Sequence, residues 1–298
     1  MRLNLYLTFS FFIGSIAFVV AQANLLNAKI PQEVGKFNEQ QLITNDNAPL
    51  EYGYVDDRDV MWSKTIWEIV DLDERINFPY YYPTDTLNLG TDRRSLFDVL
   101  LNNIRKENIT EVYGSSYFLE KKSVQDVNES LISIDTLEMG IEQLNAGEEL
   151  DPQFVRTSEI TSRQIRQYKI KGTWYFDKRL GELKYRMLGI CPVAPDVSFL
   201  DAPEEEQDLV ELFWVWFPSA RSSLNRYNVF NHKNASQPIT FDLMLNTRRF
   251  NSIIYKEENT YEDRLIADYI YEDALRQLLE SERIRNVIRD YEQDMWSN

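Results

Sequence analysis

Residues 165–187 read IRQYKIKGTWYFDKRLGELKYRM, and this stretch decides the fold that we expect. From Ile165 to Phe176, large apolar side chains alternate with lysines, as they do in a β-strand with one buried face. The run DKRLG at 177–181 is typical of a tight turn. Apolar and basic residues alternate again from Leu183 to Met187. The stretch therefore predicts a long β-hairpin with one apolar side.

Downstream of the hairpin, three further elements and a long helix are predicted. The run LVELFWVWF at 209–217 is apolar on both faces, which indicates a strand in the middle of a sheet. A short helix is expected over Phe241–Asn246 and a further strand over Asn251–Lys256. From Thr260 to the end, apolar residues keep a helical period without Pro or Gly, so we expect one long helix with Thr260 at its start.

Upstream of the hairpin, the pattern predicts two helices separated by a loop. The apolar residues of the stretch 60–72 lie at helical spacing: Trp62, Ile66, Ile69 and Val70. The segment INFPYYYPTD at 76–85 predicts an extended loop, because two prolines bracket three tyrosines. A second helix is expected over Leu96–Lys106, capped by Ser95, and a short strand over Val112–Leu119.

The order of these elements favours an α+β fold. Strands and helices do not alternate in a βαβ rhythm, so we expect an antiparallel sheet built around the long β-hairpin, with helices that include the long C-terminal one. Residues 133–159 are acidic and contain glycines, which is typical of a linker or a long loop. We therefore expect one domain over residues 59–298, with two sub-halves that divide near 133–160.

The N-terminus has the pattern of a secretory signal peptide over residues 1–21. Arg2 precedes an apolar run from Leu5 to Val20, and the small residues Ala21 and Ala23 follow it, so cleavage after either alanine fits. The alternative is an uncleaved anchor, but the apolar run is shorter than the roughly 20 residues that a membrane span needs. Residues 22–58 are polar, without a sustained period, and predict an N-terminal arm.

The composition excludes several classes of function. The chain has 48 acidic and 32 basic residues and a net charge of −16, which repels nucleic acid and anionic membrane surfaces. Membrane contact is therefore expected only through partners. The single cysteine, Cys191, is expected in the core, and the single histidine, His232, at the surface. We therefore expect no catalytic residues, no metal site and no cofactor.

Basic residues gather on the predicted hairpin of this acidic chain and form a candidate docking stripe. They are Lys169, Lys171, Lys178, Arg179, Lys184 and Arg186. One interpretation is that these cations protect an exposed strand from aggregation. The other is that they dock onto an acidic surface, either on a partner or on another copy of the chain. Tyr80, Tyr81 and Tyr82 are a second candidate contact, for a partner or a glycan.

Several segments resemble one known family. They are WSKTIWEIVDLDERINFPYYYP from 62, RRSLFDVLLNNI from 93, ITEVYGSSYF from 109, RQYKIKGTWYFDKRLGELKYRMLGICPVAP from 166, ELFWVWFPSAR from 211 and FDLMLNTRRFNSIIYKEEN from 241. In their aromatic and proline placements they are similar to the GldN/PorN family of the Bacteroidetes gliding motility and type IX secretion machinery. The resemblance covers residues 56–296.

The resemblance implies a structural role without enzymatic activity. Members of the family are periplasmic and form a ring with the outer-membrane lipoprotein GldK/PorK, and they are thought to link that ring to the inner-membrane motor proteins GldL and GldM/PorM. It implies self-association within the ring and a location at the inner face of the outer membrane. Two alternatives stand beside it. One is an exported glycan-binding protein that uses the three tyrosines, and the other is a hydrolase with two facing carboxylates.

Overall fold

The computed structural model describes residues 48–85, 93–136, 138–147, 151–200, 202–203, 207–229 and 239–297. The predicted signal peptide, the N-terminal arm up to residue 47 and His232 lie outside the described residues. The last part of that arm, residues 48–58, is described and ends in the short 3-10 helix η2 (Asp57–Asp59).

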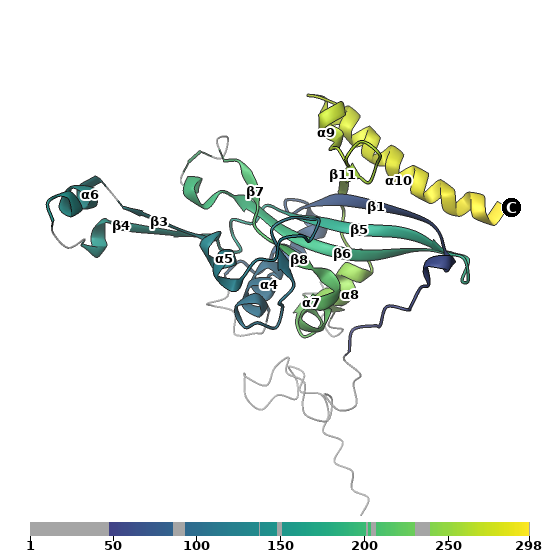
Figure 1. Cartoon of the computed structure of the whole chain (residues 1–298), viewed down its shortest axis with the longest axis horizontal. Coiled ribbons are helices and arrows are strands. Elements are labelled where there is room, and N and C mark those ends of the chain that lie inside the picture. The colour runs from purple at the N-terminus through teal and green to yellow at the C-terminus, as the bar shows by residue number, and fades with distance from the viewer. Residues whose placement is uncertain are drawn as a thin grey trace, which may run out of the picture. The chain divides into compact units, whose positions relative to one another are not determined.

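A seven-stranded antiparallel sheet forms the centre of the described chain (Figure 1), which confirms the predicted α+β class. The strand order is β11-β1-β5-β6-β8-β2, and β7 pairs with β6 beside β8. The strands are β1 (Val60–Asp71), β2 (Val112–Tyr113), β5 (Gln167–Asp177), β6 (Glu182–Pro195), β7 (Leu209–Glu211), β8 (Trp214–Trp216) and β11 (Ile253–Glu257).

The β5–β6 hairpin is the predicted one. Asp177 pairs with Glu182 at the turn, and the ladder continues to Gln167 opposite Val193. Gly181 has a φ of 65°, and its N–H donates to the Asp177 carbonyl at 2.8 Å. This left-handed conformation suits glycine and explains why the turn falls at DKRLG. A bulge after Lys171 shifts the register by one residue.

The first predicted helix is wrong, because residues 60–71 form strand β1. This strand lies between β5 and β11, and the consecutive residues Ile66, Trp67 and Glu68 are all buried. A strand that is covered on both faces loses the period of two. Its apolar residues then fit a helical spacing by coincidence, while the β-branched Thr65, Ile66 and Ile69 favour the strand.

The described helices differ in length, and all but α6 lie around the central sheet. They are α3 (Phe78–Tyr81), α4 (Leu96–Arg105), α5 (Val124–Glu129), α6 (Glu138–Asn145), α7 (Phe217–Leu224), α8 (Phe241–Asn246), α9 (Ile266–Tyr269) and α10 (Ala274–Ser297). Smaller elements are the 3-10 turns η3 (Arg75–Asn77), η4 (Pro152–Phe154) and η5 (Val197–Phe199) and the strand pair β9 (Asn228–Val229) and β10 (Ile239–Thr240). The Ser95 hydroxyl accepts from the Asp98 N–H, so α4 begins where the capping pattern predicts.

Two other predictions need correction. The segment INFPYYYPTD contains η3 and the one-turn helix α3 rather than an extended loop, because Pro79 stands in the first turn of α3, where its missing N–H costs nothing. The run LVELFWVWF is interrupted after Glu211, so it forms β7 and β8, and α7 begins at Phe217. The prediction that this run lies in the middle of the sheet is confirmed for β8, which lies between β6 and β2.

The C-terminal helix begins at Ala274, not at Thr260. The chain between β11 and α10 forms turns and the one-turn helix α9, and Glu262, Asp263 and Glu272 have positive φ values. Side chains at 259–263 bond the local backbone instead of starting a helix; Asp263 Oδ1 accepts from the Asn259 N–H at 3.0 Å. Helix α10 itself runs alongside β11 and the hairpin (Figure 1).

The core has two main parts. The larger part packs α4, α7 and α8 onto the sheet, and its fully buried side chains include Phe97, Phe213, Phe217 and Phe241. The smaller part lies beneath α10, where Ile284 and Ile288 contact Ile66 and Ile254. Tyr291 stacks on Trp62 at 4.6 Å between ring centroids, which fixes the C-terminal half of α10 beside the hairpin.

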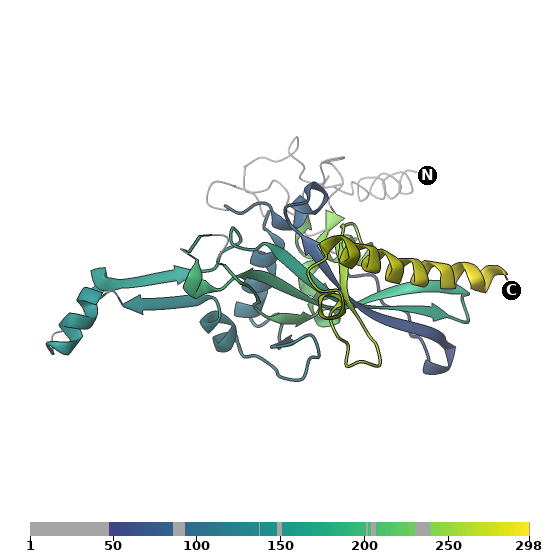
Figure 2. The ribbon, with the colours of Figure 1, turned by 90° about the horizontal axis from the view of Figure 1, so that it is seen from above.

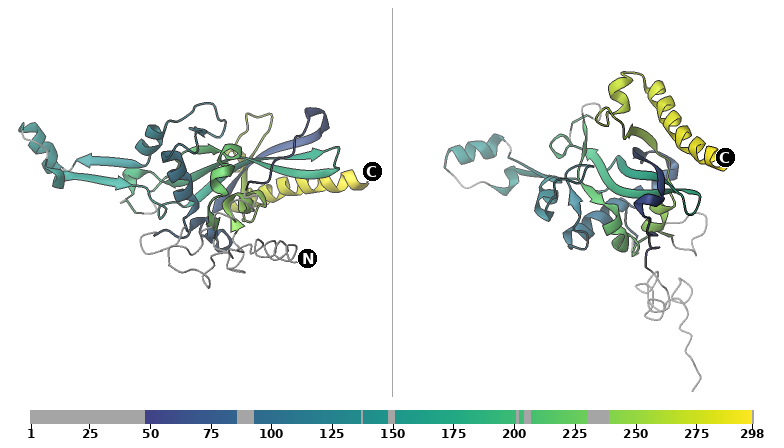
Figure 3. Two further views of the ribbon diagram at one scale, coloured as in Figure 1. Left: turned by 90° about the horizontal axis from the view of Figure 1, so that it is seen from below. Right: turned by 45° about the vertical axis from the view of Figure 1, so that its right-hand side comes forward.

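The described residues between 132 and 159 form an extension that we call the ribbon. It consists of β3 (Ile132–Thr136), α6 and β4 (Val155–Glu159), and β3 pairs only with β4. The ribbon projects from the body of the chain, away from the β5–β6 turn (Figures 1 and 2; Figure 3, left). The expected linker or long loop is thus a protruding structured element in its described residues.

Candidate functional site

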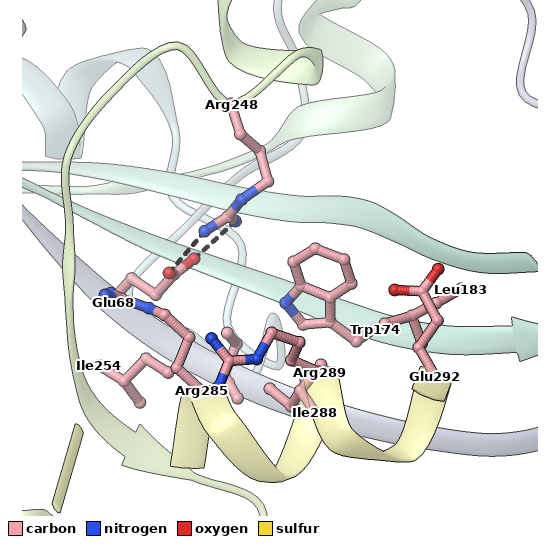
Figure 4. Close-up of a pocket in the computed structure, with 10 residues that line it drawn as sticks. Glu68, Trp174, Leu183, Arg248, Ile254, Arg285, Ile288, Arg289 and Glu292 are labelled. Carbon is pink, nitrogen blue, oxygen red and sulfur yellow. Dashed lines mark hydrogen bonds and ion pairs between the residues drawn. The ribbon is translucent and has the colours of Figure 1, made fainter. Parts of the chain in front are cut away.

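A buried ion pair lies at the meeting point of β1 and the loop after α8. The Arg248 guanidinium donates to both Glu68 oxygens, at 2.7 and 2.8 Å (Figure 4). Glu68 also accepts from the Ser252 hydroxyl at 2.9 Å, and its side chain is 1% exposed. Burial alone would lower the pKa of Arg248, but the bonds to Glu68 raise it above its ordinary value. The pair links two segments that lie 180 residues apart through two charge-assisted hydrogen bonds.

Beside this pair, α10 and the sheet border an open groove of about 300 Å³, which we call the α10 groove. Its sheet side consists of Ile66, Trp174, Leu183 and Ile254, together with the Glu68–Arg248 pair (Figure 4). This volume is at the lower end of the roughly 300–1,000 Å³ of small-molecule sites. The four apolar residues of the sheet side give the groove a surface that suits an apolar side chain.

The helix side of the α10 groove is basic. Arg285, Ile288, Arg289 and Glu292 line it from α10. Arg285 is fixed by its bonds to the Ser252 carbonyl and to Glu282, both at 2.6 Å. Arg289 is largely exposed, and its nearest acid is Asp290 at 3.8 Å. An exposed pair at that distance contributes little, so the charge of Arg289 is available to a ligand.

Two carboxylates, Glu68 and Glu292, line the groove, and Glu68 is fully engaged. Both Glu68 oxygens are already occupied by Arg248, and Tyr185 donates to one of them at 3.5 Å. Neither Glu68 oxygen is therefore left without a donor. The described residues also contain no group of three or more His, Cys, Asp or Glu that could hold a metal ion.

Two of the predicted docking lysines, Lys169 and Lys171, are engaged with groups of the chain itself, and Lys171 shares a ring with Lys256, which was not predicted. Lys171 donates to the Ser116 carbonyl at 2.9 Å and lies over Trp67, 4.7 Å from the ring centroid. Lys256 lies over the same ring at 4.4 Å and donates to the Tyr117 hydroxyl at 2.7 Å. Burial lowers the pKa of Lys171, and the nearby Lys256 lowers it further. Lys169 forms an ion pair with Glu211 at 2.8 Å.

The cations near the hairpin turn hold residues 51–55 against the sheet. Arg186 donates to the Gly53 carbonyl at 3.0 Å and stacks on Tyr52 at 4.8 Å. Arg179 pairs with Asp59 at 2.9 Å and donates to the Tyr54 carbonyl. Lys184 lies 3.6 Å from Glu182, and Lys178 is exposed. The six predicted cations thus fall into two groups, one near Trp67 and one near the turn.

Tyr52 is the anchor of this N-terminal segment. Its ring lies 4.1 Å from the Arg221 guanidinium, and its hydroxyl donates to Asn246 Oδ1 at 2.6 Å. Arg221 is itself paired with Asp242 through two bonds at 2.8 and 3.1 Å. Burial raises the pKa of Tyr52 to about 12. The end of the predicted N-terminal arm is therefore part of the folded domain.

The three consecutive tyrosines do not form one aromatic platform. Tyr80 is buried between Phe241 and Phe250, and its hydroxyl donates to the Arg249 carbonyl. Tyr81 is half-buried and donates to the Arg163 carbonyl, while Tyr82 is largely exposed. One turn of helix points successive side chains in different directions, so only Tyr82 is left for a stacked ligand.

Sequence reasoning missed the α10 groove. Its arginines, Arg248, Arg285 and Arg289, come from two segments, and no spacing in the sequence joins them to Glu68. One signal was present: Glu68 is the only charged residue in the run IWEIV. An acid within such a run, once assigned to a buried strand, requires a basic partner.

Comparison with known protein families gives a match over most of the chain. A family described as "Gliding motility associated protein GldN" matches residues 55–297. The match begins before η2 and ends at the last residue of α10, so it includes the hairpin, the ribbon and the α10 groove. No curated protein matches the chain.

Proposed function

This chain belongs to the GldN family of gliding motility associated proteins, and from that membership we propose that it is a structural subunit of a ring in the type IX secretion and gliding motility apparatus. The family assigns the chain to the motility machinery. Beyond this assignment, we propose that the protein is part of a ring, and we propose its partners and its location. The observation that carries it is a family match that extends over the whole described domain.

The proposed location is the periplasm, at the inner face of the outer membrane. The N-terminal sequence supports export, with residues 1–21 as the signal peptide and cleavage after Ala21 or Ala23. In the described part of the chain, no helix combines the length and the hydropathy that crossing a bilayer requires. An outer-membrane lipoprotein of the GldK/PorK type would therefore hold the protein in place.

The proposed contacts are with that lipoprotein, with further copies of the chain and with the periplasmic part of a GldM/PorM-type motor protein. Residues 22–58 remain proposed as an N-terminal arm, whose end around Tyr52 packs on the domain proposed over residues 59–298. Among the candidate docking residues, Lys178, Arg179 and Tyr82 are exposed. Lys169, Lys171, Lys184 and Arg186 are less exposed, and each already has a partner within the chain.

The test is purification of the tagged full chain from the envelope of its own host, followed by mass spectrometry. We expect an outer-membrane lipoprotein to co-purify, and deletion of the gene to stop protein export through the apparatus. An unrelated exported protein with the same tag is the control. Recovery of the chain without any envelope lipoprotein, or normal export after deletion, would overturn the proposal.

A further inference from the structure

The ribbon exposes apolar side chains that nothing in the described chain covers. Ile134 on β3 is 67% exposed, and on α6 Met139 is 62% and Ile141 is 47% exposed. A two-stranded ribbon on its own is at best marginally stable in water. Apolar residues concentrated at the end of such an extension mark a contact surface.

The ribbon is also strongly acidic. Between Ile132 and Glu159 the sequence has seven carboxylates and one arginine. Glu142 on α6 is exposed, one residue after Ile141. A partner surface for this element must therefore combine an apolar floor with basic residues at its edge.

The α10 groove has this composition. Its floor consists of Ile66, Trp174 and Leu183, and Arg285 and Arg289 stand on its helix side (Figure 4). Glu292 lines the same helix side, so two arginines face one glutamate there. Of the two arginines, Arg289 has only a long contact to Asp290, and its charge is the most accessible to an acidic partner.

The ribbon and the α10 groove lie at opposite ends of the sheet. The ribbon leaves the body at one end, while the hairpin turn and the C-terminal half of α10 lie at the other (Figures 1 and 2). A ribbon therefore cannot reach the groove of its own chain. Only the groove of a different copy could receive it.

We propose that the ribbon of one copy inserts apolar side chains of β3 and α6 into the α10 groove of the next copy, so that copies associate head to tail. This contact is heterologous, because the two surfaces are different, and a heterologous contact builds rings or open filaments rather than closed dimers. The inference rests on the proposed function, since it names the contact through which ring subunits would meet.

Thiol crosslinking tests the contact directly. Cys191 is buried, so a cysteine introduced at the surface is the only reactive thiol. One full-length variant carries Ile141→Cys on the ribbon and another carries Arg289→Cys on the groove. Mixed and treated with a flexible bis-maleimide, the two should give a covalent dimer that neither variant gives alone.

The matched control replaces the groove cysteine with Leu119→Cys. Leu119 is 83% exposed and is not among the residues that line the groove. It should give only background crosslinking with Ile141→Cys. Equal crosslinking to the two positions, or none to Arg289→Cys, would overturn the proposal. So would a wild-type chain that sediments as a monomer at every concentration used.

A charge exchange gives a second, independent measurement. Glu142→Arg and Arg289→Glu should each weaken self-association about tenfold in sedimentation experiments, and the combination in one chain should recover most of the loss. Both residues are exposed, so circular dichroism should show an unchanged fold. Single variants that associate like the wild type would count against the contact.

These results are separable from those that test the proposed function. If the crosslink fails while the lipoprotein still co-purifies, the head-to-tail contact is wrong and the function stands. If the crosslink forms while no lipoprotein co-purifies, the contact stands and the function is wrong. If Arg289→Glu removes the lipoprotein but leaves self-association unchanged, the groove receives the lipoprotein, and the proposed occupant is wrong.

Discussion

At the scale of single residues, Glu68 and Arg248 illustrate how an unfavourable buried charge becomes a structural link. Each ion alone would cost several kcal/mol to bury, and the pair is tolerated because its two bonds and the Ser252 hydroxyl satisfy the carboxylate. The pair does not by itself demonstrate a net gain over apolar residues. It does make the two partners depend on each other.

Glu68→Gln should therefore lower the free energy of unfolding by about 3–5 kcal/mol, because it leaves Arg248 buried and unpaired. Adding Arg248→Met should cost less than the sum of the single changes. Urea unfolding followed by tryptophan fluorescence measures both. The control is Arg276→Ala, which removes an exposed pair with Asp273 and should change stability by less than about 0.5 kcal/mol. Equal losses in Glu68→Gln and the control would contradict the prediction.

Tyr52 carries a prediction about alkaline pH. Its pKa is raised from 10.0 to about 12 in the folded chain, so folding favours the neutral phenol. That contribution is fully present below pH 10 and is lost as the pH rises through about 12. Tyr52→Phe should cost about 1 kcal/mol at neutral pH through the lost bond to Asn246.

The same variant should lose less further stability than the wild type when the pH rises above 10, because phenylalanine cannot ionise. Thermal unfolding at neutral and alkaline pH measures the difference. Other buried tyrosines remain in both proteins, so the comparison isolates residue 52. Parallel pH profiles for the two chains would show that Tyr52 does not contribute to the alkaline loss.

At the scale of elements, the sequence predicted best where one face of a strand or helix meets water. The β5–β6 hairpin alternates because its lysines partly face solvent, and α4 has both a cap and an apolar stripe. Strand β1 was mistaken for a helix because both of its faces are covered, which removes the alternation. The ribbon was mistaken for a loop because its side chains are mostly exposed, so burial leaves little pattern in its sequence.

The candidate site was less predictable than the fold. The basic residues of the hairpin were identified, but their division into two groups depends on contacts with Trp67 and Tyr52, which are distant in the sequence. The α10 groove depends on where α10 packs, and neither periodicity nor composition specifies that placement. Contacts between residues that lie more than a hundred positions apart in the sequence are decided by tertiary packing.

Gly172 in β5 supports a prediction at the same scale. A Cβ atom at this position would lie 2.1 Å from the Tyr185 hydroxyl oxygen, a distance that packed atoms do not tolerate. Gly172→Ala should therefore lower stability by about 1–3 kcal/mol through overpacking of the hairpin. The matched control is Gly53→Ala, where nothing lies within 4 Å. Equal midpoints of urea unfolding for the two variants would refute this steric account.

At the scale of the whole molecule, two electrostatic effects oppose each other. Copies with a net charge of −16 repel at long range, while the ribbon and the α10 groove attract at short range. The Debye length is about 30 Å at 0.01 M and about 10 Å at 0.1 M, so the first additions of salt screen mainly the long-range repulsion. At about 1 M it is about 3 Å, which also weakens contact ion pairs.

Self-association should therefore be strongest near about 0.1 M salt and weaker at both extremes. Sedimentation velocity at a fixed protein concentration measures this profile. In the Arg289→Glu variant, self-association should decrease less at high salt than in the wild type, because this variant already lacks the attractive charge of Arg289. An association that grows steadily up to the highest salt would show that apolar contact alone holds the copies together.

The placement of the ribbon at one end and the groove at the other gives every copy a donor and an acceptor. A chain without its ribbon would still accept a neighbour but could not reach the following one. Small amounts of such a truncated copy, produced beside the normal protein, should halt growth at each point where it enters. The truncated copy should therefore act dominantly over the normal protein. The fractional loss of export should exceed the fraction of copies in the cell that are truncated.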